Sequence, residues 1–393
     1  MSSASATVIP STAPAPIGAT ELVDALAIRD LSDPASGPHA MQLLLDGACE
    51  ALASLWRVPV RVLRPSPIAT VADNYDNLGY SAEDVTRQAR YTRYLSADVM
   101  LRSHTSAGVP PVLRDLARRR ARSHDEVIAL PGLCYRRDSV DRLHVGTPHQ
   151  LDLWRVTDSA RLGRVQLLEM AEALVEAVLP GARWRAVPAT HPYTIDGHQI
   201  DVLRGEEWVE LAECGVVAAP VLRRAGLDPR LWNGLALGMG LDRAVMLRTG
   251  VPDIRMLRAA NPRIAKQMLD LEPWQPVSAQ PEVRRDLSLV LDAPADGEQL
   301  DELLGDPARE ALGCDADVLE SLVVLTETAP TELPTAARRR LRIRPGQVNA
   351  LVRLTLRPLD RTLTDAEANV LRDRVYRALH RGEVMVLITL SDE

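Results

Sequence analysis

The stretch from Asn233 to Arg248, NGLALGMGLDRAVMLR, constrains the fold of this chain more than any other segment. Three glycines alternate with apolar residues in its first half, which predicts a strand whose bare backbone can be approached closely. Asp242 and Arg243 follow, and the next residues return to helical spacing. Such a strand suits a nucleotide, because a flat ring can lie on the backbone while the guanidinium binds phosphate. Glycines that mark a bulge or tight packing are the alternative, and this stretch alone leaves both open.

The length and composition of the chain indicate a globular protein with more than one domain. The chain has 393 residues, enough to bury two or three hydrophobic cores. Its 46% hydrophobic and 25% charged residues are ordinary for a globular protein in water. The net charge of -7 disfavours indiscriminate nucleic-acid binding, so RNA contacts require local basic patches. No apolar run reaches the length of a membrane span, and no membrane association is expected.

The cysteines and the N-terminal residues predict a cytoplasmic protein. The 4 cysteines lie far apart without a C-x-x-C pair, which is typical of reduced thiols and gives no metal framework. Residues 1–20 are rich in alanine, serine and proline, and they lack the basic and apolar regions of a secretory signal. These residues predict a disordered tail.

The order of motifs along the chain resembles the class II aminoacyl-tRNA synthetases, in the form found in phenylalanyl-tRNA synthetase. GLALGMGLDR resembles motif 3 of that family, and the helix and strand predicted within residues 37–63 resemble motif 1. The run YRRD, which starts at Tyr135, matches the Y-R-R-D/E core of motif 2. The strand predicted over residues 207–217, EWVELAECGVV, resembles the family's W-x-E-(I/L)-x-G-C-G-M. This order is far more specific than any single motif.

The resemblance implies ATP as a substrate. Arg136 and Arg243 are the expected catalytic residues, because a fixed guanidinium stabilises the negative charge that builds on the α-phosphate during attack by a carboxylate. Asp138 takes the position of the motif acid that orients amino groups, and His144 fits the loop histidine near the phosphates. The expected ATP-binding residues are Arg136, Asp138, His144, Gly238, Gly240 and Arg243.

The resemblance also implies a magnesium ion on the ATP phosphates. Glu210 is its expected ligand, since hard oxygen ligands suit Mg²⁺. Glu213 follows three residues later on the same predicted strand. Side chains three apart on a regular strand point to opposite faces, so only one of the two acids is expected to bind the metal directly.

The amino-acid site implied by the resemblance combines several segments. His104 and Ser106 lie in MLRSHTS, which resembles the family's L-R-T-H-T-S. Gln150 and Asp152 match the family's F-H-Q-x-E, whose Gln and Glu grip the substrate ammonium, although aspartate shortens the reach by one methylene. Two leucines stand where the family's G-F-A-F-G has phenylalanines that line the side-chain pocket. A differently shaped apolar pocket is therefore expected around Leu235 and Leu237.

The C-terminal residues resemble the ferredoxin-fold anticodon-binding domain of the same family. The order expected for residues 279–393 is strand, helix, strand, strand, helix, strand. Thr364 and Glu367 predict a capping box at the start of the last helix. Acidic residues outnumber arginines in this part, which weakens the prediction that it binds RNA. The candidate RNA contacts are Arg284, Arg285 and Arg340.

Together these features predict an α+β protein. A catalytic domain over residues 21–260, with an antiparallel sheet flanked by helices, is joined by a linker at 261–278 to the ferredoxin-like domain. The expected function is ATP-dependent activation of phenylalanine or an analogue and its transfer to tRNA, by a homodimer or a monomer. Two alternatives stay open: a ligase that passes a non-phenylalanine or modified aminoacyl group to a non-tRNA acceptor, and a non-catalytic paralogue that acts as a binding module.

Overall fold

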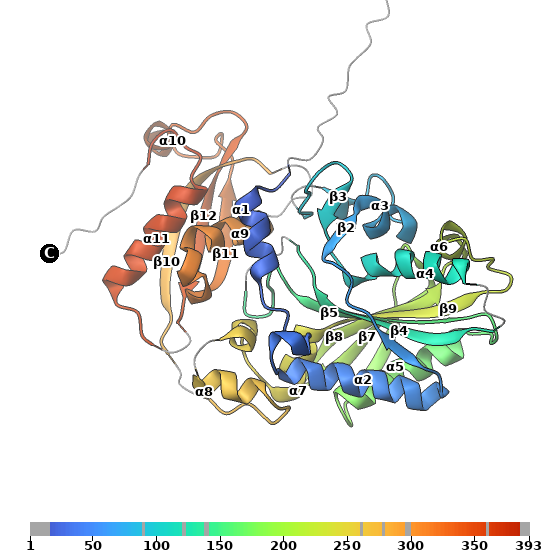
Figure 1. Ribbon diagram of the computed structural model, residues 1–393. Coiled ribbons are helices and arrows are strands. Elements are labelled where there is room, and N and C mark those ends of the chain that lie inside the picture. Colours follow the sequence, from blue (N-terminus) through green and yellow to red (C-terminus); the bar gives the residue numbers. More distant parts are fainter. Residues whose placement is uncertain are drawn as a thin grey trace, which may run out of the picture.

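The structure is a computed structural model that describes residues 16–88, 91–119, 123–136, 141–259, 262–276, 280–294, 300–358 and 361–385. Figure 1 shows two bodies of unequal size. The predicted tail of residues 1–20 lies outside the described residues as far as residue 15, and α1 (Ala19–Ala27) begins within it.

The larger body is built on a mainly antiparallel sheet, as the motifs predict. Within the described residues, the sheet has seven strands in the order β1-β4-β5-β9-β8-β7-β6. Only β1 and β4 pair in parallel. The strands are β1 (Val60–Val62), β4 (Asp125–Leu133), β5 (His149–Thr157), β6 (Trp184–Pro188), β7 (Thr194–Arg204), β8 (Glu207–Val217) and β9 (Asn233–Gly240).

Helices cover both faces of this sheet. The helix predicted in the motif 1 segment, α2 (Ala40–Trp56), packs with α5 (Arg164–Val178) and α7 (Leu241–Thr249) on one face, and their apolar side chains form the main core. The opposite face carries α4 (Val109–Arg118) and α6 (Ala219–Arg224), which pack against Trp154 and its neighbours. Figure 1 shows the first group below the sheet and the second group above it.

Shorter elements connect these layers. A two-stranded sheet precedes α4 and is followed by turns that carry the predicted His104 segment. The short elements are β2 (Ile68–Thr70), α3 (Val71–Asn74), β3 (Val99–Leu101), α8 (Pro262–Ala265) and the 3-10 turns Pro34–Ser36, Asp76–Leu78, Val85–Arg87, Thr105–Gly108, Ile254–Arg258, Lys266–Met268 and Gly313–Val318.

The smaller body contains a separate antiparallel sheet in the order β10-β12-β11. Its core lies between this sheet and the helices α9 and α11. The elements are β10 (Val283–Asp292), α9 (Leu300–Leu312), β11 (Leu319–Thr328), α10 (Thr335–Leu341), β12 (Gln347–Leu356) and α11 (Asp365–Leu379). The predicted capping box is present, because Thr364 and Glu367 each accept a hydrogen bond from the other's backbone N–H. The predicted final strand falls largely beyond residue 385, outside the described residues.

Two further features of the structure concern the state of the cysteines and the length of the helices. Cys49, Cys134, Cys214 and Cys314 are free thiols, as their spacing predicts. In the part of the chain that the structure describes, no helix has both the length and the apolar character needed to span a membrane.

Candidate active site

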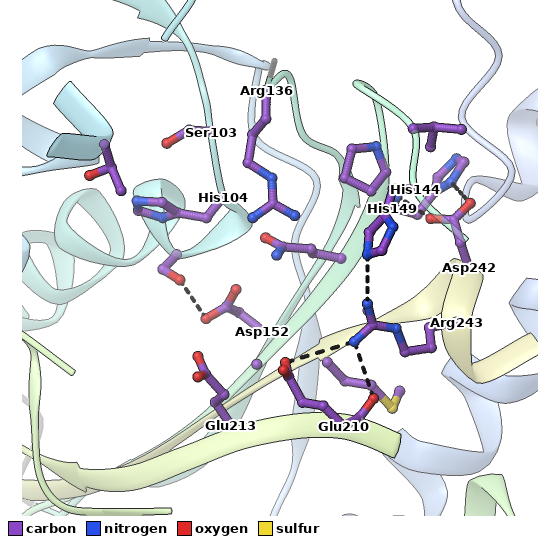
Figure 2. A pocket seen from close by; sticks show the side chains of 18 of the residues that line it. Ser103, His104, Arg136, His144, His149, Asp152, Glu210, Glu213, Asp242 and Arg243 are labelled. Atoms are coloured by element: carbon purple, nitrogen blue, oxygen red, sulfur yellow. Dashed lines mark hydrogen bonds and ion pairs between the residues drawn. The ribbon is translucent and has the colours of Figure 1, made fainter. Parts of the chain in front are cut away.

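A cavity of about 590 Å³ lies over the middle of the large sheet. Its floor crosses three neighbouring strands, because Gly238 of β9 is directly opposite Asp152 of β5 on one side and Glu213 of β8 on the other. Residues paired in this way share a face of the sheet. Figure 2 shows side chains from these strands, from the loop before β5 and from the start of α7 pointing into one space. The cavity therefore joins the His104 segment, the acidic strand and the segments that resemble motifs 2 and 3.

The prediction that Leu235 and Leu237 line the side-chain pocket is wrong. Both leucines are buried in the core with α2, α5 and α7, on the opposite face of the sheet from the cavity. The reason is the two-residue period of a strand, since Gly238 and Gly240 face the cavity while Leu235 and Leu237 point into the core on the other face. The leucines therefore give no information about the shape of the amino-acid pocket.

The expectation that Glu210 and Glu213 face opposite ways is also wrong, because β8 is not a regular strand. Asp201 of β7 pairs with Glu210, but its neighbour Ile200 pairs with Ala212, so Leu211 is an extra residue. Such a bulge rotates the strand, and both glutamates line the cavity. The sequence contains no signal for the bulge, since the apolar residues of β8 fit a regular strand equally well.

Arg243, at the start of α7, lies between Glu210 and His144. Its Nη1 is 4.0 Å from Glu210 Oε1 and donates to the Glu210 carbonyl oxygen over 3.3 Å. Its Nη2 is 3.5 Å from His144 Nε2, and His144 Nδ1 contacts Asp141 at 2.8 Å. Burial raises the pKa of the Glu210 carboxyl, and the Arg243 charge opposes this shift. The predicted ATP-binding residues His144 and Arg243 thus lie together with Glu210, the predicted magnesium ligand.

Arg136 enters the same cavity from the side opposite Glu210, as Figure 2 shows. Its backbone N–H donates to the Gly146 carbonyl oxygen over 2.8 Å, and this bond joins the two ends of the loop between β4 and β5. The two predicted catalytic arginines therefore face one cavity. Asp138, the predicted motif acid, lies outside the described residues.

A buried histidine fixes the start of α7. His149 is fully buried, and its Nε2 accepts from the Leu31 backbone N–H at 2.9 Å. Its Nδ1 must then carry the proton, which it donates to Asp242 Oδ1 over 3.0 Å. Burial opposes ionisation of Asp242, but the His149 contacts outweigh it and lower the pKa of this carboxyl. This pair holds β5 against α7 and so fixes the position of Arg243.

His104 is a neutral histidine in the wall of the cavity. Its ring stacks on Tyr80 with centroids 5.6 Å apart. Burial, helped by the Arg136 charge, lowers its pKa to about 3. Asn74 Oδ1 accepts from the Ser103 N–H, which directs the Asn74 amide toward His104 Nε2 at 3.4 Å. His104 Nδ1 then carries the proton, and it is a buried donor without a partner among the described residues, as expected of a ligand contact.

Asp152 is buried under the cavity and already accepts hydrogen bonds. Thr105 Oγ1 donates to one carboxylate oxygen over 2.6 Å, and Ser106 Oγ donates to the other over 2.7 Å. Trp154 Nε1 donates to that second oxygen over 3.1 Å. Burial raises the pKa of Asp152, against the effect of these donors. The predicted amino-acid residues Ser106, Gln150 and Asp152 thus meet here, beside His104.

Comparison with known proteins identifies the family. A family model described as "tRNA synthetases class II core domain (F)" matches residues 54–268. The chain belongs to this family. The phenylalanine–tRNA ligase, chloroplastic/mitochondrial, of Arabidopsis thaliana is 26% identical over 324 residues, which cover 79% of this chain and 68% of that protein. The phenylalanine–tRNA ligase alpha subunit of Prochlorococcus marinus (strain MIT 9313) is 30% identical over 240 residues, or 61% of this chain and 69% of that protein.

Solved structures of pyrrolysyl-tRNA synthetase are also similar to this chain. A crystal structure of pyrrolysyl-tRNA synthetase from Desulfitobacterium hafniense is 18% identical, with a TM-score of 0.44, and the match covers 61% of this chain and 78% of that one. The family resemblance inferred from the motifs is therefore confirmed by the family model and the relatives.

Sequence reasoning missed the aromatic wall of this class II synthetase cavity. Tyr80 and Tyr193 both line it, and Tyr193 stacks on Trp154 with centroids 5.8 Å apart. Burial raises the pKa of both tyrosines, so their hydroxyls stay protonated. Strand parity was the available signal for the pocket floor, because Ala236, not its leucine neighbours, shares the face of Gly238. No motif quoted from the sequence contained Tyr193.

The candidate RNA-binding arginines lie on the smaller body. Arg284 pairs with Glu282, and Arg285 donates to Asp365 over 2.7 Å. Arg340 is exposed on α10. The two arginines of β10 are engaged with carboxylates, so an RNA phosphate would have to compete for them.

Proposed function

We propose that this class II synthetase activates phenylalanine or a close aromatic analogue with ATP and transfers the aminoacyl group to tRNA. The observation that carries the proposal is the convergence of Arg136, Arg243 and Glu210 on one cavity that also has an aromatic wall. The names of the relatives, phenylalanine–tRNA ligases, support the choice of amino acid.

The cavity suits a triphosphate on the side of Arg243. Arg243 and Arg136 would bind and neutralise phosphate oxygens, and Gly240 leaves the strand backbone open to the adenosine. Attack of the amino-acid carboxylate on the α-phosphorus forms the aminoacyl–phosphate bond and releases diphosphate. Arg136 is the group that stabilises the charge that develops there.

The donor set also fits magnesium. No group of three or more histidine, cysteine or acidic side chains in the described part of the chain can hold a metal by itself. Glu210 would therefore hold the ion together with phosphate oxygens, which is common for Mg²⁺. Bound there, the metal neutralises phosphate charge and orients the diphosphate as leaving group.

The amino-acid part of the proposal rests on Tyr80, Tyr193 and His104. The Tyr80 ring stacks on His104 and is tilted against Tyr193, and together these rings form a wall against which an aromatic side chain can pack. The argument for an unusual substrate, which rested on two leucines, no longer applies, because those leucines are in the core. The alternatives of a non-tRNA acceptor or a non-catalytic module are therefore not favoured.

We also propose that residues 21–260 form a catalytic part and residues 279–393 an RNA-binding part. The segment 261–278 joins them. Exposed basic side chains such as Arg340 support RNA binding by the second part. A cytoplasmic location, and a homodimer or monomer as the active form, complete the proposal.

Amino-acid-dependent ATP–pyrophosphate exchange tests this function. We expect exchange to be fastest with phenylalanine across a panel of amino acids, and added tRNA to become charged. Arg136→Gln and Arg243→Gln should each lower exchange by about 100-fold or more, because each removes a charge that the transition state needs. Arg204→Gln, at the end of β7 and away from the cavity, is the matched control. Exchange with no amino acid, despite a folded protein, would refute the proposal.

A further inference from the structure

Two carboxylates face each other across a glycine on the cavity floor. Asp152 and Glu213 both pair with Gly238, from β5 and from β8. Neighbouring strands lie about 4.8 Å apart, so about 10 Å separates the two backbones. A methyl group built on Gly238 would meet nothing closer than Asp152 Oδ1 at 4.0 Å, so the space above this glycine is open. Figure 2 shows the carboxylates of Asp152 and Glu213 in the same cavity.

The acceptors that sequence reasoning assigned to the substrate ammonium are already engaged. Asp152 accepts three hydrogen bonds, from Thr105, Ser106 and Trp154. Gln150 Oε1 accepts from Cys134 Sγ at 3.2 Å and from the Thr105 N–H at 3.4 Å, so its amide NH₂ is left for other partners. An ammonium group has only donors, and it needs acceptors. Three of the about four acceptor positions of Asp152 are already filled, and Gln150 Oε1 is shared by two donors.

Glu213, unlike Asp152, is partly exposed in the cavity. Its side chain is 42% exposed, whereas the Asp152 residue is 3% exposed. Among the described residues its one ion-pair partner is His191, whose Nε2 lies 3.2 Å from Oε1. His191 is buried behind it and lowers the pKa of this carboxyl, so Glu213 is ionised. Position 213 corresponds to glycine in the strand pattern G-C-G-M that this segment resembles.

We propose that Glu213 is the carboxylate that binds the α-ammonium of the amino-acid substrate, in the space above Gly238. Asp152 then acts as a positioning residue that holds Thr105 and Ser106. The longer side chain on the neighbouring strand supplies a carboxylate that is not engaged with Thr105, Ser106 and Trp154, as Asp152 is. His191 orients Glu213 from behind, and the aromatic side chain of the substrate lies against Tyr193. This inference rests on the proposed function, because it assumes an aromatic amino acid in the cavity.

Binding of two substrate fragments tests the assignment without any catalytic step. L-Phenylalaninol keeps the ammonium and lacks the carboxylate, and 3-phenylpropionate keeps the carboxylate and lacks the ammonium. Calorimetric titration of the full chain should find that Glu213→Gln weakens phenylalaninol binding by about tenfold or more, since a charge-assisted hydrogen bond is lost. Phenylpropionate binding should change less than threefold. Glu207→Gln, an exposed acid on the same strand, is the matched control and should leave both affinities unchanged.

The other outcomes separate this inference from the proposed function. Unchanged phenylalaninol binding in Glu213→Gln would overturn the assignment and leave the proposed function intact. A raised magnesium requirement for ATP binding, with phenylalaninol affinity unchanged, would make Glu213 a metal ligand instead. Failure of the wild-type chain to bind either fragment would overturn the aromatic substrate and this assignment with it. Glu213→Gly, which restores the residue of the family pattern, guards against a local effect of glutamine and should behave as Glu213→Gln does.

Discussion

At the scale of single residues, burial sets the protonation of the cavity more than neighbouring charges do. Burial is the first cause of the pKa shifts of His104, Asp152 and Tyr193, and in each case it favours the neutral form. Asp242 and Glu213 are different, because each contacts a histidine that lowers its pKa. The carboxyls whose pKa is lowered are therefore those that contact a histidine. A substrate with two charges meets fixed charges at a few defined points only.

The low pKa of His104 predicts a pH dependence of stability. Its pKa falls from 6.5 in the unfolded chain to about 3 in the folded protein. The unfolded state thus binds more protons between these values, so stability is lost as the pH falls below 6.5. We expect the urea midpoint of the wild-type chain to drop between pH 7 and pH 5, and to drop less in His104→Gln. An equal drop in both proteins would mean that His104 is protonated in the folded state.

At the scale of the elements, much of the fold follows from the sequence and part of the site does not. The Gly-rich strand, the motif 1 helix and the capping box at Thr364 have strong local signals, and all three are present. The bulge at Leu211 has none, because it depends on how β8 pairs with β7. The wrong prediction for Leu235 and Leu237 has a different cause. The alternation of glycines and apolar residues in β9 is visible in the sequence and places both leucines on the face opposite Gly238, whereas the family pattern places them in the pocket.

We expect substitution of Gly238 in β9 to affect binding, and substitution of Gly234 in the same strand to affect folding. Gly238→Ala should fold normally, since the added methyl meets only Asp152 Oδ1 at 4.0 Å. The methyl would occupy the space above the strand, and the KM for the amino acid should rise by about tenfold, measured by exchange. Gly234→Ala is the matched contrast, because its methyl would lie 2.5 Å from the Arg155 carbonyl oxygen. It should lower the free energy of unfolding by about 1–3 kcal/mol. Unchanged amino-acid binding in Gly238→Ala would show that the ligand lies elsewhere.

At the scale of the whole molecule, a buried ion cluster joins the two bodies. Glu320 of β11 is 4% exposed and contacts Arg142 at 3.2 Å and Arg357 at 2.5 Å. Arg255, which is also buried, donates to the Asp317 carbonyl oxygen over 2.6 Å. Arg142 and Arg255 belong to the larger body, so the cluster crosses the junction. Arg142 lies in the loop before β5, and this contact connects the second body to the cavity wall.

Removal of Glu320 should therefore loosen the junction without unfolding either body. Loss of the charged contacts of Glu320 should cost about 1.5–3 kcal/mol, because Arg255 keeps its contact with Asp253 and Arg357 keeps its contact with Glu282. We expect Glu320→Ala to split thermal unfolding into two transitions and to speed proteolysis near residues 261–278. Glu327→Ala, an exposed acid on the same strand, should keep the wild-type profile. Because the cores of the two bodies are separate, each should keep its own cooperative transition. A single transition at the wild-type temperature in Glu320→Ala would mean that other contacts, such as the Arg93–Asp306 ion pair at 2.8 Å, hold the bodies together.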